Sequence, residues 1–283
     1  MLLPGTYANG FAPRDGRPLY PELWKGCVGA WNPGLGVSGL TLRDQSGFQN
    51  NGTLINGPTW AVNQGRYAMS FDGTNDYVDY GTGVNIYGLS QFSCSYWVYL
   101  ASNISTAVLS RHDENLSPIT GDYFGAFSSR SAPPQAIANF TGATGYDNIN
   151  FRSTNSLALN RLNHVAISVN LVTPANTTIS INGVPDIVII STGGGTPPTT
   201  FKAATATTWK SARITASGGY QQYTQFIADD IMLFRNFMSY SGHRLLATRR
   251  GIAYEMAPRR RSSSAVPVTS YSTFRPSVLR GSR

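Results

Sequence analysis

The sequence predicts an all-β fold: a two-sheet antiparallel jelly-roll sandwich with one short C-terminal helix and an extended arm at each end. Only 13% of the 283 residues are charged, whereas Gly (29) and Pro (16) are abundant; an average globular protein has about 25% charged residues. Short runs rich in β-branched and aromatic residues recur about every ten residues, separated by turn residues. A single helical pattern accompanies them, which favours a sandwich over an alternating α/β fold.

The first 25 residues contain several prolines and glycines and no hydrophobic periodicity, so we expect an extended arm. The aromatic residues within it indicate that it docks on another surface. Its opening residues lack the charged and apolar segments of a secretory signal peptide. No apolar run reaches the length of about 18 residues that a membrane span needs. We therefore expect neither a signal peptide nor a membrane-spanning helix.

The strands are expected in succession from residue 26. The segment 49–57, QNNGTLING, is dense in Asn-Gly and predicts turns. The run 91–100 alternates cleanly and places Phe92, Cys94, Tyr96 and Val98 on one face. The predicted strands are 26–31, 67–73, 76–81, 91–100, 106–111, 122–129, 162–172, 177–184, 185–191 and 226–234.

Two features complete the predicted body. Asn182-Gly183 is expected to join 177–184 and 185–191 as a hairpin. The segment 238–251 has the one helical pattern, with Ser239 or Ser241 as its cap and Gly251 as its end.

The chain has two cysteines, Cys27 and Cys94. Cys94 lies in a strand pattern, which predicts a buried free thiol. A disulfide between the two remains the alternative, because two cysteines alone do not decide it.

The charge is segregated at the C-terminus. Nine of the 22 Lys and Arg residues and one of the 14 acidic residues lie in 244–283, so this segment carries the whole formal charge of +8. We predict an N-terminal arm at 1–25, one nearly neutral domain at 26–250 and a basic, Pro/Ser-rich arm at 251–283. Such an arm is expected to seek an acidic partner.

Six blocks of sequence, in order, resemble the laminin-G-like, concanavalin A-like lectin domains of bacterial and tailed-phage proteins. They include an Asp-x-Ser-Gly…Asn-Asn-Gly-Thr segment, a Phe-Asp-Gly…Asp-Tyr-Val strand pair, an Ile-Asn-Gly hairpin and a closing strand with a helix. One departure is Leu162, where the family often has Trp. The two arms lie outside the resemblance and look like those on phage members. The blocks are 42–60, 68–81, 92–100, 162–170, 179–184 and 227–249.

Catalysis is not predicted. Glycoside hydrolases of the resembled architecture use a Glu-x-Asp-x-x-Glu strand, which places two carboxylates on one face. The three Glu residues, Glu22, Glu114 and Glu255, do not lie in such a strand. The three histidines form no metal-ligand pair, and no nucleophile motif surrounds a serine. Glycan hydrolysis is kept as the third of three functional hypotheses.

The resemblance implies one candidate cation site. Members of this architecture often hold Ca²⁺ through Asp and backbone oxygens. The matching positions are Asp72, in the Phe-Asp-Gly turn, and Asp229 and Asp230 in the closing strand. The alternative is that Asp72 makes a turn hydrogen bond and that one of the other two faces solvent.

A sugar site needs an exposed aromatic plate with polar partners. The sequence offers four candidates for this plate; alternatively, they fill the sandwich core. The candidates are Trp97, Trp209, Tyr220 and Tyr223.

The basic arm has three interpretations. It could contact nucleic-acid phosphates, but no nucleic-acid-binding module accompanies it, so we do not predict this. It could be a solvated tail. We prefer an arm that orders along an acidic protein neighbour. Its contact residues would be Arg249, Arg250, Tyr254, Arg259, Arg260, Arg261, Tyr271 and Phe274.

The missing signal peptide, the neutral domain with its basic tail and the phage-like resemblance together predict a non-enzymatic virion structural protein of a tailed phage. It would decorate the capsid or be a minor structural subunit. It would contact the major capsid protein or neighbouring structural subunits, associate with itself and touch host glycans. The alternative is a carbohydrate-binding module of a bacterial surface or secreted protein.

Overall fold

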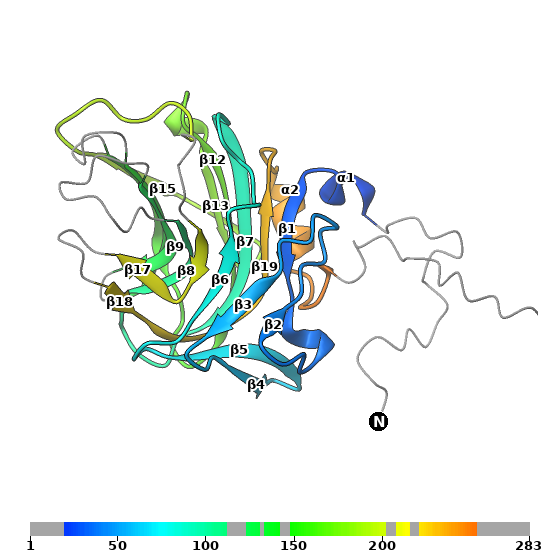
Figure 1. The fold of residues 1–283 in the computed structure, drawn as a ribbon. Coiled ribbons are helices and arrows are strands. Elements are labelled where there is room, and N and C mark those ends of the chain that lie inside the picture. Colours follow the sequence, from blue (N-terminus) through cyan, green and yellow to red (C-terminus); the bar gives the residue numbers. More distant parts are fainter. Residues whose placement is uncertain are drawn as a thin grey trace, which may run out of the picture.

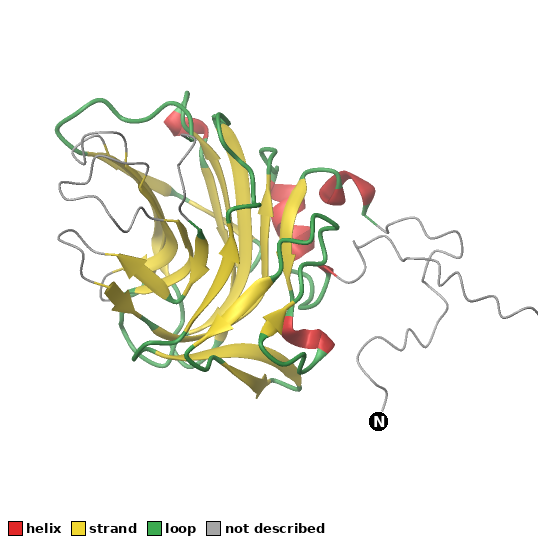
Figure 2. Ribbon diagram, viewed as in Figure 1, coloured by secondary structure: helices red, strands yellow, loops and turns green. Residues whose placement is uncertain are grey.

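The computed structural model describes residues 20–111, 123–130, 133–141, 148–201, 208–215 and 221–253. Two large antiparallel sheets pack face to face, and the short helices lie outside them (Figures 1 and 2). The predicted antiparallel sandwich is confirmed. None of the helices in the described ranges is long and apolar enough to cross a bilayer.

The first sheet has eight strands in the order β14-β13-β12-β7-β19-β5-β4, with β1 paired to β19. Its central pair, β7 and β12, is joined along its whole length, from Leu162 opposite Tyr99 to Asn170 opposite Gln91. The strands are β1 (Cys27–Trp31), β4 (Thr59–Asn63), β5 (Arg66–Asp72), β7 (Gln91–Tyr99), β12 (Leu162–Asn170), β13 (Thr178–Ile181), β14 (Val184–Asp186) and β19 (Gln225–Phe234).

The second sheet has nine strands in the order β15-β11-β10-β9-β8-β16-β6-β3-β2. They are β2 (Thr41–Leu42), β3 (Gly52–Ile55), β6 (Tyr77–Gly81), β8 (Thr106–Arg111), β9 (Tyr123–Arg130), β10 (Gln135–Thr141), β11 (Asn148–Ser156), β15 (Val188–Thr192) and β16 (Trp209–Ser211). The remaining elements are a two-stranded ribbon of β17 (Arg213–Thr215) and β18 (Gln221–Tyr223), two α-helices, α1 (Pro21–Trp24) and α2 (Tyr240–Leu246), and the 3-10 turns η1 (Pro33–Leu35) and η2 (Pro174–Asn176).

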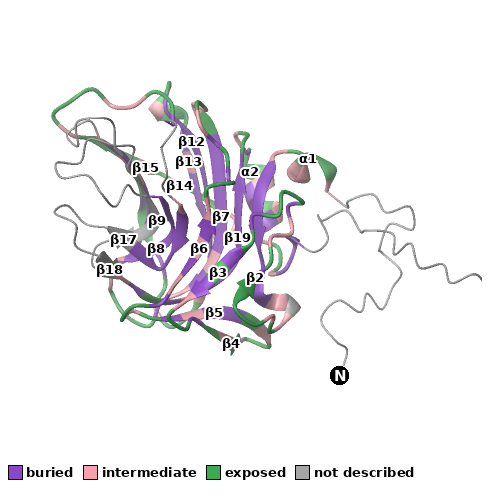
Figure 3. Cartoon of the chain, in the orientation of Figure 1, coloured by how far each residue is buried: buried purple, intermediate pink, exposed green. Residues whose placement is uncertain are grey.

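The core lies between the two sheets (Figure 3). The alternation predicted for 91–100 is confirmed: the four residues assigned to one face of β7 are all buried in this core. Cys27 and Cys94 are both buried free thiols, as predicted for Cys94, and burial raises the pKa of each.

The predicted hairpin partner 185–191 does not form one strand. It breaks at Ile187, so that β14 pairs with β13 in the first sheet while β15 pairs with β11 in the second. The Asp186 carboxylate holds this corner, because it accepts hydrogen bonds from the backbone and side-chain amides of Asn155 and from the backbone N–H of Ile187. This corner forms one side of the candidate site.

The prediction of turns over 49–57 was correct only at its end. Asn56 and Gly57 adopt positive φ angles of 59° and 100°, as a turn requires, but Gly52–Ile55 forms β3 and pairs with β6. Strands β10 and β11 were not predicted, because residues that are uncommon in strands interrupt both: two Ala and one Asn in β10, and three Asn in β11.

Both ends of the body join a second hydrophobic cluster on the outer face of the first sheet. Residues 21–24 form a helical turn where an extended arm was expected, because Leu23 and Trp24 pack on this cluster. Ile252 and Ala253 are fully buried there, beyond the predicted boundary at 250. The body therefore includes the described residues from Tyr20 to Ala253.

Candidate functional site

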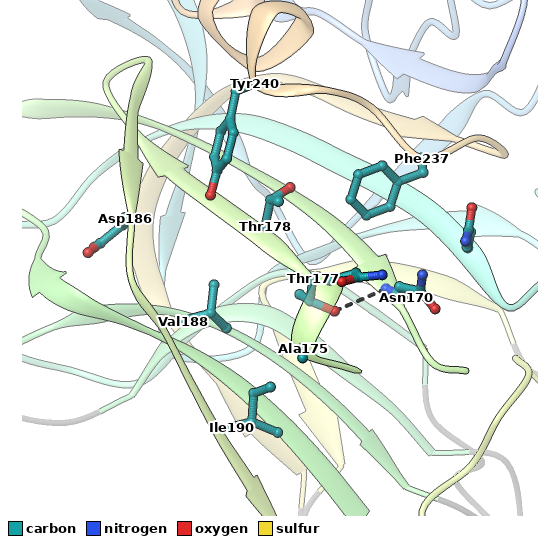
Figure 4. Close-up of a pocket in the computed structure, with 11 residues that line it drawn as sticks. Asn170, Ala175, Thr177, Thr178, Asp186, Val188, Ile190, Phe237 and Tyr240 are labelled. Atoms are coloured by element: carbon teal, nitrogen blue, oxygen red, sulfur yellow. Dashed lines mark hydrogen bonds between the residues drawn. The ribbon is translucent and has the colours of Figure 1, made fainter. Parts of the chain in front are cut away.

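An open groove of about 630 Å³ lies beside the corner between β14 and β15 (Figure 4). We call it the Tyr240 groove. Its walls come from the start of β7, the end of β12 with η2, the β13–β14 edge, β15 and the start of α2. The lining residues are Gln91, Asn170, Ala175, Asn176, Thr177, Thr178, Asp186, Val188, Ile190, Phe237 and Tyr240.

Two aromatic rings, Phe237 and Tyr240, line one side of this groove (Figure 4). Tyr240 is 37% exposed, so its ring can accept a ligand. Burial, and then the negative charge of Asp186, raise the pKa of the Tyr240 hydroxyl above its usual value. The hydroxyl is therefore protonated at neutral pH and can donate a hydrogen bond.

Polar groups on the other sides are held in fixed positions. The backbone N–H of Asn170 donates to Thr177 Oγ1 at 3.0 Å, and Asn170 Oδ1 accepts from the backbone N–H of Thr173 at 2.8 Å. The two oxygens of Asp186 accept three N–H groups from Asn155 and Ile187, at 2.7–3.0 Å. Asp186 is only 8% exposed, so its carboxylate mainly fixes this corner of the groove and places a negative charge beside Tyr240.

The groove thus combines an exposed aromatic surface with amide, hydroxyl and carboxylate groups. An aromatic ring covers the apolar C–H face of a sugar, while such polar groups bond its hydroxyls. Among the described residues, Asp186 is the only acidic side chain that lines the groove. The arrangement suits recognition of a polyhydroxylated ligand.

A buried polar cluster fixes α2, and with it Tyr240, on the sheet. Ser168 Oγ lies 2.7 Å from His243 Nε2, and Ser95 Oγ lies 2.9 Å from His164 Nε2. Burial lowers the pKa of His243 to about 4, and burial with the neighbouring His243 lowers that of His164 to about 3. Both imidazoles are therefore neutral at physiological pH.

A second groove, of about 720 Å³, adjoins the first and shares Tyr240 with it. We call it the Arg244 groove. It runs between the Asn182-Gly183 turn and α2, and it is lined by Asn182, Gly183, Val184, Pro185, Tyr240, Ser241, Arg244, Ala247 and Thr248.

Of the four residues predicted for an aromatic plate, the structure describes three, and none of these three is in the exposed class. Trp209 is fully buried, stacks on Phe201 at 5.8 Å and donates from Nε1 to the Val84 carbonyl, so its assignment to a sugar site was wrong. Trp97 is half-buried against His164 and lines neither groove. Tyr223 is half-buried in the two-stranded ribbon, and Tyr220 lies outside the described residues.

The three candidate Ca²⁺ ligands are not brought together. Asp72 lies opposite Gln225 on β19, so Asp229 is four residues further along this strand, roughly 13 Å away. Asp72 accepts from the Thr74 N–H, as the turn alternative predicted, and Asp230 accepts from Asn32 Nδ2 and the Gly251 N–H. No group of three or more His, Cys, Asp or Glu side chains in the described part of the chain could hold a metal ion.

Arg250 does not belong to a free arm. Its Nε donates to Asp229 Oδ2 at 2.9 Å and its Nη1 to the Asn63 carbonyl at 2.7 Å, while Arg66 Nη1 donates to the Arg250 carbonyl. Buried Asp229 requires this partner. Arg249 is exposed. The other predicted arm residues lie outside the described residues: Tyr254, Arg259, Arg260, Arg261, Tyr271 and Phe274.

Sequence reasoning missed the residues that line the two grooves, above all Tyr240, Asp186 and Arg244. Tyr240 and Arg244 lie in the predicted helix, four positions apart, which was a usable signal that they share one helix face. Asp186 follows the Asn-Gly turn, but the corner at which it lies appears only when β14 and β15 are seen in different sheets.

The comparisons with solved structures agree with this architecture. The binding domain of Paraclostridial Mosquitocidal Protein 1 is similar with a TM-score of 0.54 and 14% identity over 80% of this chain and 52% of that chain. A botulinum neurotoxin type C structure is similar with a TM-score of 0.51 and 16% identity, over 81% of this chain and 52% of that chain. Trypanosoma rangeli sialidase is similar with a TM-score of 0.50 and 15% identity, over 79% of this chain and 32% of that chain. The chain thus spans about half of the toxin chains and a third of the sialidase chain. At these identities the likeness shows the fold.

No curated protein matches the sequence. A family model, described as the concanavalin A-like lectin/glucanases superfamily, matches residues 72–240, which is more than half of the chain. This match includes the strands that line the Tyr240 groove and ends at Tyr240 itself. The chain belongs to the concanavalin A-like lectin/glucanases superfamily.

Proposed function

We propose that the protein is a carbohydrate-binding module and that the Tyr240 groove holds the sugar. The observation that carries this proposal is the exposed Tyr240 ring beside the fixed polar groups of Asn170 and Asp186 in one open groove. Binding would need little rearrangement, because hydrogen bonds within the protein already position both polar side chains.

We propose binding without hydrolysis. Glycoside hydrolysis uses two carboxyl groups on either side of the scissile bond, whereas Asp186 is the one acidic side chain that the described residues bring to this groove.

The ligands named with similar structures support a glycan. Trypanosoma rangeli sialidase has been solved with sialic acid, and the binding domain of botulinum neurotoxin DC with SialylT. Cell entry of botulinum neurotoxin type C depends on two ganglioside molecules.

The test is a glycan array probed with the wild-type protein, Tyr240→Ala and Tyr67→Ala. Tyr67 is a matched control, because it is 38% exposed and lies outside both grooves. We expect the wild type and Tyr67→Ala to bind the same glycans and Tyr240→Ala to lose them. Equal binding by all three proteins, or no binding by the wild type, would contradict the proposal.

A second proposal concerns assembly: the module is a virion structural subunit of a tailed phage, attached to capsid or neighbouring subunits by its terminal segments. It is supported by the second hydrophobic cluster, in which the first described residue, Tyr20, and the last, Ala253, both take part. The sequence that follows Ala253 contains most of the excess positive charge. A bacterial cell surface is the alternative location.

This second proposal is tested by particle incorporation. A chain ending at Ala253 keeps the described body and should fail to join particles assembled with the other structural proteins. Incorporation equal to that of the full chain would overturn it.

A further inference from the structure

We propose that the ligand is an acidic oligosaccharide whose neutral part lies in the Tyr240 groove and whose anionic group binds Arg244 in the adjoining groove. This inference rests on the proposed carbohydrate binding and adds the chemical class of the glycan. The anionic group is a carboxylate or a sulfate, which the guanidinium would bind in the same way.

The two grooves share one lining side chain. Tyr240 lines both of them, with Asp186 in the first groove and Arg244 in the second. Tyr240 and Arg244 are four residues apart on α2, so their side chains lie on the same face of the helix. A ligand on the Tyr240 ring would therefore lie on the same helix face as Arg244.

The grooves differ in charge. Among the described residues, Asp186 is the only charged side chain that lines the Tyr240 groove. Arg244 is the only charged side chain among them that lines the Arg244 groove. Arg244 is exposed, and no hydrogen bond or ion pair joins its guanidinium to another described residue. Hydroxyl groups would therefore be accepted beside Asp186, while an anion would be repelled there and attracted at Arg244.

The Arg244 groove has a rigid floor. Gly183 has a φ of 76°, and a Cβ at this position would lie 3.0 Å from the Cβ of Ala247 on α2. The hairpin turn is thus packed directly on the helix beneath Arg244. The Asn182 side chain is fixed in the same turn, because its Oδ1 accepts the backbone N–H of His164 at 2.8 Å, so its amide group can donate to the same anion.

The test uses lactose, 3′-sialyllactose and 3′-sulfolactose, which share one neutral core and differ in the anionic group. Each is titrated into the wild-type protein, Arg244→Gln and Arg43→Gln by calorimetry. Arg43 is an exposed arginine that lines neither groove, so its variant loses the same charge elsewhere. The comparison is extended beyond lactose with a glycan array that carries other neutral oligosaccharides and their acidic forms. The array is probed with the same three proteins.

We expect the wild type and Arg43→Gln to bind an acidic glycan more tightly than the neutral glycan with the same core. Arg244→Gln should lose about tenfold in affinity for the acidic member and none for the neutral member, as removal of one charged hydrogen bond predicts. Preference for the sialylated or the sulfated probe identifies the anionic group.

Two results would overturn the inference in different ways. If glycans bind in a Tyr240-dependent manner but Arg244→Gln leaves the acidic preference unchanged, or no such preference exists, the Arg244 subsite fails while carbohydrate binding stands. If no glycan binds in a Tyr240-dependent manner, the proposed function fails, and the subsite fails with it.

Discussion

Tyr240 and Asp186 line the same groove from different elements, and the charge of Asp186 contributes to the raised pKa of the Tyr240 hydroxyl. One residue begins α2 and the other ends β14. The Ser168–His243 contact beneath α2 positions Tyr240. The hydrogen bonds from Asn155 at the β14–β15 corner position Asp186. Hydrogen bonds to the sandwich edge therefore hold both sides of the groove in place.

Replacing Asp186 with Asn should weaken binding of array-identified glycans about tenfold, because Asn cannot accept all three N–H bonds that fix this corner of the groove. Calorimetric titration measures this. Asp79→Asn is the control, since Asp79 also accepts a backbone N–H at a strand end, that of Gly81, but lies outside both grooves. Unchanged affinity of Asp186→Asn would exclude its carboxylate from the site.

His243 should make stability depend on pH. Burial lowers its pKa from 6.5 to about 4, so the unfolded chain takes up this proton at a higher pH than the folded protein does. Its contribution is complete above pH 6.5 and is lost as the pH falls towards 4, by at most roughly 3 kcal/mol. Urea unfolding of the wild type and His243→Gln between pH 7 and pH 4 checks this.

The quantity that tests this is the difference in unfolding free energy between the wild type and His243→Gln at each pH. Asp230, whose pKa is raised to about 7 by burial and by Asp229, contributes the opposite slope, because the folded state then binds the extra proton. The wild type should lose stability relative to His243→Gln as the pH falls. Parallel curves would show that His243 is not held neutral.

Arg250→Gln should destabilise the body by about 3 kcal/mol, because it leaves the fully buried carboxylate of Asp229 without its cation. Chemical denaturation measures the loss. The double variant Asp229→Asn/Arg250→Gln should recover part of it, since position 229 then carries no charge that needs a partner. A loss below about 1 kcal/mol in the single variant would mean that water or another cation replaces Arg250.

Truncation should locate the end of the body. A chain that ends at Ala253 should melt at the same temperature as the full chain. One that ends at Arg249 should be less stable, because it loses the Arg250–Asp229 pair and buried Ile252, whose burial alone contributes about 2 kcal/mol. Equal melting temperatures for the two truncated chains would show that the residues after Arg249 do not belong to the body.

The sequence was sufficient to predict strands in which apolar and polar residues alternate clearly. The strand 91–100 buries the predicted face, and the closing strand 226–234 falls within β19. The sequence was insufficient where contacts between distant residues decide which side chains are buried and which lie together. Nothing local distinguishes Trp209, enclosed by Phe201 and the Val84 carbonyl, from a tryptophan on the surface. Tyr240 and Asp186 are 54 positions apart in the chain and meet only because β14 and α2 share one edge of the sheet.

The most direct test of carbohydrate binding at the Tyr240 groove is an NMR titration of the ¹⁵N-labelled protein with the tightest array glycan. We expect the changes in backbone amide shift to concentrate at Ala175, Asn176, Thr177 and Tyr240, with few changes around Trp97. Saturable shifts that cluster elsewhere, with the Tyr240 groove unaffected, would contradict it.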